Sequence, residues 1–230
     1  MIDTHAHLDF KQFDKNREKV IARCFKDGVK KIINIGYSLK IQHKNIYFAV
    51  GYHPFDIKKF DSEKLKKLAQ RAVAIGEIGL DATKNNLKRQ KEVFIQQLAI
   101  AKKFNLPVII HCRKLHDEII KFIKGHRGVV HCFAGSFKQA QKYLDLGFYL
   151  SFTGLITYDR SYDKVILNTP LEKILLETDC PFLAPAPYRH KRCEPWMMKF
   201  TAQKIAEIKN IAYNKIIKQT SNNAEKLFKI

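Results

Sequence analysis

Eight short apolar runs, separated for the most part by segments with helical periodicity, constrain the fold of this 230-residue chain more than any other feature. The runs show almost no polar alternation, which is typical of parallel strands covered by helices on both faces. We therefore predict eight strands, at residues 2–9, 31–36, 46–51, 73–78, 107–111, 128–131, 148–152 and 173–179.

Eight successive βα units predict an α/β fold, a TIM-like (β/α)8 barrel that occupies residues 1–230 as one domain. The length suits this architecture, because such barrels often form one domain of roughly 200 to 250 residues. The link at residues 37–45 is too short for a full helix, so we expect a degraded βα unit there. An open, doubly wound sheet is the alternative fold.

The charge balance points towards polyanionic partners. Lys and Arg total 42 against 22 Asp and Glu, a formal net charge of +20. Such an excess favours nucleic acid as a partner, although lysines spread through the predicted helices also fit a solvated surface that binds nothing. The sequence begins with a strand and not with a signal peptide, and no apolar run is long enough to cross a bilayer. We expect a cytoplasmic protein with no membrane contact and no obligate protein partner.

Cysteine usage argues against a disulfide framework. The five cysteines are an odd number and show no Cys-x-x-Cys spacing, so neither structural disulfides nor a thiolate zinc site is indicated. Cys112 and Cys132 each follow a histidine at a strand end. Strand alternation predicts that both side chains turn towards the helices as packing residues.

Two histidines in the first strand form the first candidate metal-ligand pair. His5 and His7 are two residues apart, so in a strand their side chains project to the same face. Two ligands alone make no site, and polar residues at a frayed terminus are the alternative reading.

Four further candidate ligands, however, come at the ends of other apolar runs, the place where a barrel presents its chemistry: Glu77, His111, His131 and Asp179. His5 and His7 come early in their strand and are the exception to this rule. Nitrogen and oxygen ligands without thiolate suit Mg²⁺, Mn²⁺ or Zn²⁺. Because six ligands exceed what one catalytic zinc needs, we predict two divalent ions that share a carboxylate, with Glu77 as the bridge.

Successive motifs in this chain resemble those of the TatD family of metal-dependent deoxyribonucleases. The resemblance covers residues 2 to about 195, and its motifs occur in the family's order: Asp3-Thr-His-Ala-His-Leu-Asp9, Gly51-Tyr-His-Pro54, Gly76-Glu-Ile-Gly-Leu-Asp81, Pro107-Val-Ile-Ile-His-Cys-Arg113, His131-Cys-Phe133, Glu177-Thr-Asp-Cys-Pro181 and Pro187-Tyr-Arg-His-Lys-Arg-Cys-Glu-Pro195. The resemblance implies a TIM-like barrel of the amidohydrolase-related metallohydrolases and a DNase activity, often that of a 3′-to-5′ exonuclease.

The resemblance also implies individual roles. The ligands of one ion correspond to His5, His7, Glu77 and Asp179, and the ligands of the other ion correspond to Glu77, His111 and His131. It implies that Asp179 accepts a proton from the attacking water, and that His53 faces the substrate phosphate. A histidine that only fixes the turn before Pro54 is the alternative for His53.

Two arginines are candidate phosphate contacts, Arg113 and Arg189, because a guanidinium pairs two phosphate oxygens at once; solvated surface arginine is the alternative. The family pattern Arg-Gly-Lys-x-Asn-Glu-Pro reads Arg189-His-Lys-Arg-Cys-Glu-Pro195 in this chain, so its substrate preference is open.

The predicted reaction is hydrolysis of a phosphodiester bond by a metal-activated water, with DNA or RNA as substrate. Two other functions fit the same residues. One is a metallohydrolase for another ester or amide, such as the ester of aminoacyl-tRNA, and the other is a nucleic-acid-binding barrel without catalysis.

Overall fold

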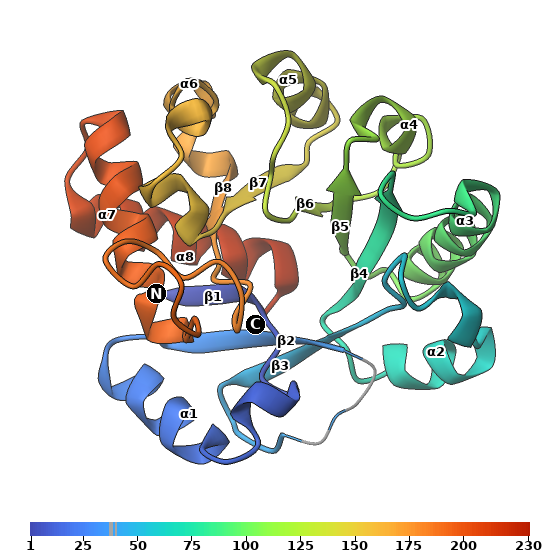
Figure 1. The fold of residues 1–230 in the computed structure, drawn as a ribbon. Coiled ribbons are helices and arrows are strands. Elements are labelled where there is room, and N and C mark those ends of the chain that lie inside the picture. The colour runs from blue at the N-terminus through green and yellow to red at the C-terminus, as the bar shows by residue number, and fades with distance from the viewer. Residues whose placement is uncertain (37–38, 40) are drawn as a thin grey trace.

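The computed structural model describes residues 1–36, 39 and 41–230, and its centre is a sheet of eight strands (Figure 1). The strands lie in chain order from β1 to β8, and every neighbouring pair is parallel. Their bounds are β1 Ile2–Ala6, β2 Lys31–Gly36, β3 Ile46–Val50, β4 Ala74–Asp81, β5 Val108–Arg113, β6 Gly128–Val130, β7 Tyr149–Phe152 and β8 Ile174–Leu176.

The sheet closes on itself beside β1. Ala6 forms a parallel bridge with Cys180, and the amide of Asp179 donates to the carbonyl of His5 at 2.9 Å. The amide of His7 donates to the carbonyl of Cys180 over the same distance. Strand order and closure together confirm the TIM-like barrel and exclude the open doubly wound sheet, in which the strand order would reverse.

Helices surround the outside of the strands (Figure 1). Their bounds are α1 Arg17–Lys26, α2 Ser62–Ala69, α3 Leu87–Lys103, α4 His116–Ile120, α5 Phe137–Asp145, α6 Asp163–Asn168, α7 Met198–Lys209 and α8 Tyr213–Phe228. In the link between β2 and β3, the described residues 39 and 41–45 contain no helix; residues 37, 38 and 40 of this predicted degraded unit lie outside the described part. In the described chain no helix is long and apolar enough to cross a bilayer.

The last helix plugs one end of the barrel. Alternate residues of the strands, such as Ile33 and Ile35 of β2, form an inner apolar cluster, whereas Ile32, the residue before Ile33, belongs to the outer cluster beneath the helices. Leu227 and Phe228 of α8 pack against that inner cluster. Because this end is filled with apolar side chains, polar chemistry is left to the other end, where the strands finish.

Several predicted bounds were wrong, among them the end of β1 and that of the helix expected over residues 115–124. The segment after β5 is helical only to Ile120, because Lys121 and Phe122 donate to carbonyls three residues back and this tighter turn brings Ile123 into the core. β8 ends at Leu176, before the predicted end at Asp179, whose φ of 56° is left-handed and ends extended structure. Conversely, β4 runs on to Asp81.

Candidate metal centre

All six candidate metal ligands lie around the open end of the barrel. His5 lies next to the last residue of β1, and His7 follows that strand directly. The expectation that these two come early in their strand was therefore wrong, because β1 stops at Ala6. His131 and Asp179 follow β6 and β8, and the other two lie within their strands: Glu77 in β4 and His111 in β5.

One side of the centre combines the His-x-His pair with two carboxylates. The Nε2 atoms of His5 and His7 are 3.1 Å apart, so the two rings do converge as predicted. His7 Nε2 lies 3.3 Å from Asp179 Oδ1, and His5 Nε2 lies 3.4 Å from Glu77 Oε2. Two imidazoles and two carboxylate oxygens thus face one small volume.

The second oxygen of Glu77 faces a different set of histidines. Glu77 Oε1 lies 2.8 Å from His111 Nδ1 and 3.1 Å from His131 Nε2. His53 Nε2, which comes from the loop after β3, lies 3.6 Å from the same oxygen. The carboxylate therefore stands between two groups of ring nitrogens, as a bridging ligand requires.

The donor atoms gather closely enough to hold a cation. Within three triads the potential ligand atoms all lie within 4.8 Å of one another: His5 with Glu77 and His131, His5 with His7 and Asp179, and His53 with Glu77 and His111. Imidazole nitrogen and carboxylate oxygen suit Zn²⁺ and Mn²⁺, while Mg²⁺ favours the oxygens. The chemistry of these residues therefore fits divalent ions.

Burial and charge shift the pKa values within the centre in opposite directions. Burial opposes ionisation of Glu77, but the charge of His131 and the hydrogen bonds from His111 and His131 outweigh it, so the pKa of Glu77 lies well below its ordinary value. Burial also disfavours protonation of His131, yet Glu77 and Glu177 raise its pKa well above the usual range. Without an ion, the pair of Glu77 and His131 is thus held as an ion pair, and a bound cation would replace that positive charge.

His53 presents a hydrogen-bond donor to the centre. Its Nδ1 accepts the amide of Phe55 at 3.1 Å, and burial lowers the pKa of His53 to about 4. A neutral ring that accepts at Nδ1 carries its proton on Nε2, the atom nearest Glu77. His53 therefore both fixes the turn at Pro54 and directs an N–H into the site.

Sequence reasoning missed two carboxylates that orient the histidines. His111 Nε2 lies 3.0 Å from Asp81 Oδ2, and His131 Nδ1 lies 3.3 Å from Glu177 Oε1. Carboxylates that bond the far nitrogen of a ligand histidine fix its tautomer and its orientation. The sequence did contain a signal for both. Asp81 is an acidic residue four residues after the predicted ligand Glu77, and Glu177 is an acidic residue two residues before the predicted ligand Asp179.

A third missed carboxylate, Asp3, connects the first strand of the barrel to the segment that follows the last strand. Its Oδ1 accepts the amides of His5 at 3.2 Å and of Thr178 at 3.0 Å, and its Oδ2 accepts the Thr178 hydroxyl at 2.6 Å. These bonds link β1 to the segment that precedes Asp179. The fully buried Asp3 therefore sets the spacing between the His-x-His pair and the aspartate opposite.

A cavity of about 1030 Å³ opens over the centre. Arg113 lines it, but Arg189 does not; its guanidinium packs over the ring of Tyr158, with 4.5 Å between the charge and the ring centroid. The acidic side chains lining the cavity outnumber its two arginines, Arg17 and Arg113. They are Asp9, Asp14, Glu18, Asp56, Glu77, Asp81 and Asp179.

The two cysteines that follow ligand histidines differ in their surroundings. Cys112 packs against the outer apolar cluster beneath the helices, as alternation predicts. Cys132, in contrast, lies beyond β6 with a φ of 43°, so the alternation of a strand does not apply to it. Its amide donates to Glu177 at 2.6 Å, and the residue thereby helps to hold that carboxylate beside His131.

Proteins of known structure share this architecture. YjjV, a TatD homologue from Escherichia coli K12, superposes with a TM-score of 0.93 at 31% identity, covering 100% of this chain and 98% of its own. A mutant organophosphorus hydrolase from Deinococcus radiodurans gives a TM-score of 0.72 at 11% identity, covering 99% and 92%, and shows the shared fold alone.

Curated relatives span the same length. A protein of Bacillus subtilis strain 168 named as the uncharacterized metal-dependent hydrolase YabD is 38% identical over 100% of this chain and 99% of its own. The similarly named YcfH of Escherichia coli K12 is 33% identical over 100% and 96%. Fold, site and relatives together define a metal-dependent hydrolase with a TIM-like barrel. Residues 2–229 match the family described as TatD related DNase, and the chain belongs to that family.

Proposed function

We propose that this chain hydrolyses phosphodiester bonds of nucleic acid, as a 3′-to-5′ exonuclease on single-stranded DNA. The observation that carries the proposal is the position of Glu77, whose two oxygens face two separate groups of ring nitrogens at 2.8 to 3.4 Å. A bridged pair of cations suits the two oxygens that gain and lose a bond in an in-line displacement at phosphorus. The family's description as a DNase supports the same substrate class.

The ligands divide between two ions, Mg²⁺, Mn²⁺ or Zn²⁺. One ion would be held by His5, His7, Glu77 and Asp179, and the other ion would be held by Glu77, His111 and His131. Bound there, the ions would lower the pKa of a water and neutralise charge on the phosphate oxygens.

The remaining roles belong to the chain's own side chains. Asp179 is 15% exposed and faces the cavity, so it can take the proton of the attacking water. His53 directs its Nε2–H into the same space, where it can donate to a phosphate oxygen. Arg113 lines the cavity and can pair with a phosphate there, and Arg189 serves the strand further out.

A second candidate function is hydrolysis of an aminoacyl ester at the end of an RNA. The observation that favours it is the presence of further carboxylates in the cavity lining besides the candidate metal ligands, namely Asp9, Asp14, Glu18 and Asp56, although Asp14 and Asp56 pair with Arg17 and Lys59. Carboxylates at this place would suit a protonated amino group better than a second phosphate.

One experiment separates these functions. Metal-stripped protein is incubated with end-labelled single-stranded DNA, with the same sequence as RNA and with an aminoacylated RNA, adding Mg²⁺, Mn²⁺ or Zn²⁺ in turn. We expect stepwise shortening of the DNA from its 3′ end with Mg²⁺ or Mn²⁺. Release of the amino acid from an RNA that stays intact would reject the nuclease in favour of the second candidate.

A further inference from the structure

Three phenylalanines at the mouth of the barrel are exposed, whereas the chain's other phenylalanines are buried or half-buried. The chain has 16 phenylalanines, and among the described residues the exposed ones are Phe10, Phe55 and Phe182, at 38%, 50% and 46%. All three line the cavity over the metal centre. Exposed apolar side chains that gather at one place on a surface mark a binding site.

The rings stand directly beside two histidines of the centre. The Phe10 ring lies 4.7 Å from the ring of His7, and Phe182 meets Phe10 edge to face at 5.9 Å. Phe55 lies 4.6 Å from the ring of His53. Since His7 faces one oxygen of Glu77 and His53 the other, the aromatic rings form two separate platforms around the bridging carboxylate.

A cation accompanies the second platform. Lys84, from the turn after β4, places its Nζ 4.5 Å from the centroid of the Phe55 ring. An aromatic face together with an ammonium group matches the two parts of a nucleotide, a flat base and a phosphate.

We propose that Phe10 with Phe182, and Phe55, are stacking platforms for the unpaired bases on either side of the scissile phosphate, so that the site selects single strands. This inference rests on the proposed nuclease function. Bases in a duplex have their faces covered by neighbouring pairs, whereas an unpaired base has a free face that stacks on an aromatic ring whatever its identity. The ring of Phe182 therefore distinguishes single-stranded from double-stranded nucleic acid, and it does not distinguish one base sequence from another.

The chain's overall charge supports this occupant over an apolar one. The net charge of +20 on the whole chain suits a polyanion, and the rings beside the candidate metal ligands suit one that also carries flat apolar groups. A lipid tail or an apolar peptide would bring no anionic group to the divalent ions that the centre would hold.

The test compares two substrates and four proteins. One substrate is a single-stranded DNA oligonucleotide, and the other is the same strand with tetrahydrofuran residues in place of its 3′-terminal nucleosides. The proteins are the parent chain and the variants Phe182→Leu, Phe182→Tyr and Leu167→Ala. Leucine keeps the apolar bulk without the ring, and tyrosine keeps the ring. Leu167 is a matched control, since it is 56% exposed on α6 and does not line the cavity.

We expect the parent chain to prefer the strand with bases, and Phe182→Leu to raise KM for that strand by about 5- to 100-fold. KM for the abasic strand should not change in this variant, and Phe182→Tyr and Leu167→Ala should behave like the parent chain. 2-Aminopurine at the 3′ end, bound in Ca²⁺, should be quenched by the parent chain and less so by Phe182→Leu.

Failure of the stacking platforms and failure of the proposed nuclease function would give different results. Equal cleavage of both strands by the parent chain, with no effect of Phe182→Leu, would overturn the stacking platforms and leave the nuclease standing. A parent chain that is folded and metal-loaded but cleaves neither strand would overturn the nuclease, and the platforms with it.

Discussion

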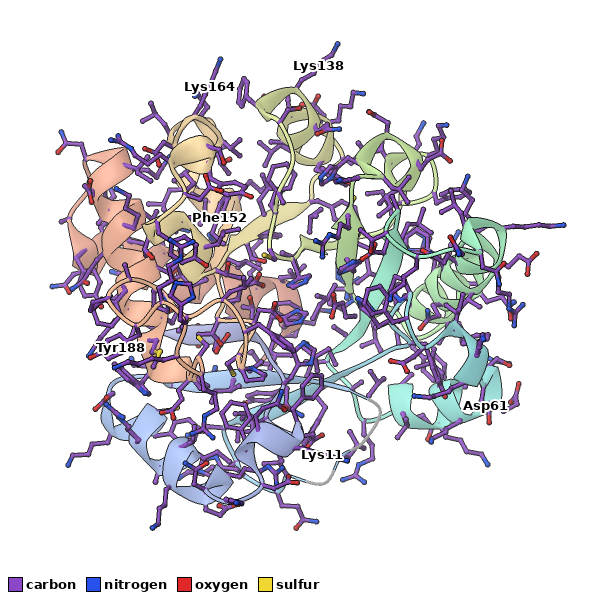
Figure 2. All side chains as sticks on the ribbon, viewed as in Figure 1. Lys11, Asp61, Lys138, Phe152, Lys164 and Tyr188 are labelled. Carbon is purple, nitrogen blue, oxygen red and sulfur yellow. The ribbon has the colours of Figure 1, made fainter. Side chains whose placement is uncertain are left out.

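The outside of this barrel and the cavity at its mouth carry opposite charge. Lysines such as Lys138 and Lys164 extend from the outer helices into solvent (Figure 2), and the whole chain has a formal charge of +20. In the cavity, by contrast, acidic side chains outnumber the two arginines. The difference indicates that the exterior can collect a polyanion by itself, while the cavity admits a phosphate only when cations offset its carboxylates.

Removing the metal ions should give the largest difference between the cavity, where cleavage takes place, and the exterior, where the strand binds. We expect exhaustive chelation to abolish cleavage, because carboxylates such as Glu77 and Asp179 would then repel the phosphate, and Mg²⁺ or Mn²⁺ to restore it. Binding of single-stranded DNA to the basic exterior should persist in part. Turnover and filter binding are measured on one preparation, with metal content checked by elemental analysis. Undiminished turnover in metal-free protein would remove the whole metal centre from the reaction.

Asp179→Asn should give the next largest effect. The amide cannot act as a base, and loss of a general base costs roughly 10²- to 10⁴-fold in rate. The fold should be unaffected, because the φ of 56° at this position is one that asparagine tolerates well. Single-turnover cleavage, strand binding and thermal unfolding are compared with those of Asp117→Asn. Asp117 is an exposed residue whose carboxylate pairs with Lys142 at 2.6 Å.

A different result would assign Asp179 to structure. A structural aspartate would lower the melting temperature when replaced and leave the folded fraction active. Cleavage by Asp179→Asn within a few-fold of the parent chain would remove this residue from the mechanism, whatever the control shows.

Glu177→Gln tests the buried carboxylate beside His131, a residue of the cavity lining, and we expect a smaller loss. The glutamine keeps the shape and can accept the Cys132 amide with its oxygen while its NH2 donates to the Ser151 hydroxyl, but it no longer holds His131 through a charge. Such partners of ligand histidines contribute about 10- to 100-fold to metal affinity or activity. Titration calorimetry of the metal-free protein measures the loss, with the exposed Glu172→Gln as control. Equal metal affinity in both variants would contradict the orienting role.

The sequence predicted the barrel because buried parallel strands leave a local trace, an apolar run with turn signals at both ends. It predicted that Glu77 and Asp179 would converge because strand ends in such a barrel share one rim, and that the rings of His5 and His7 would converge because the two are two residues apart in a strand. It could not show that Asp81 bonds His111, since this depends on the register of β4 and β5 and on the bulge between Gly76 and Ile78.

Side chains on loops were the least predictable. Arg113 and Arg189 were equivalent candidates in the sequence, yet only Arg113 lines the cavity. The end of β8 was placed too late because no Gly or Pro separates the apolar run Ile174–Leu176 from the polar segment Glu177–Asp179, and the residue type of Asp179 does not by itself require the left-handed backbone found there.

The smallest expected effect separates the arginine of the cavity from a lysine of the exterior. Each phosphate that a basic side chain neutralises releases counterions, and for single strands this contributes roughly −0.7 to the slope of log affinity against log salt. Arg113→Ala should reduce the slope by about that amount, because Arg113 lies where the strand must pass. Arg189→Ala should reduce it as well, because we propose that the strand extends beyond the cavity to Arg189, which packs over Tyr158. Lys164→Ala is the control, since the loss of one exposed lysine among 42 basic residues leaves the exterior's attraction nearly unchanged. The slopes come from fluorescence anisotropy of a labelled single strand between low and moderate salt, and equal slopes for all three variants would show that neither arginine contacts a phosphate.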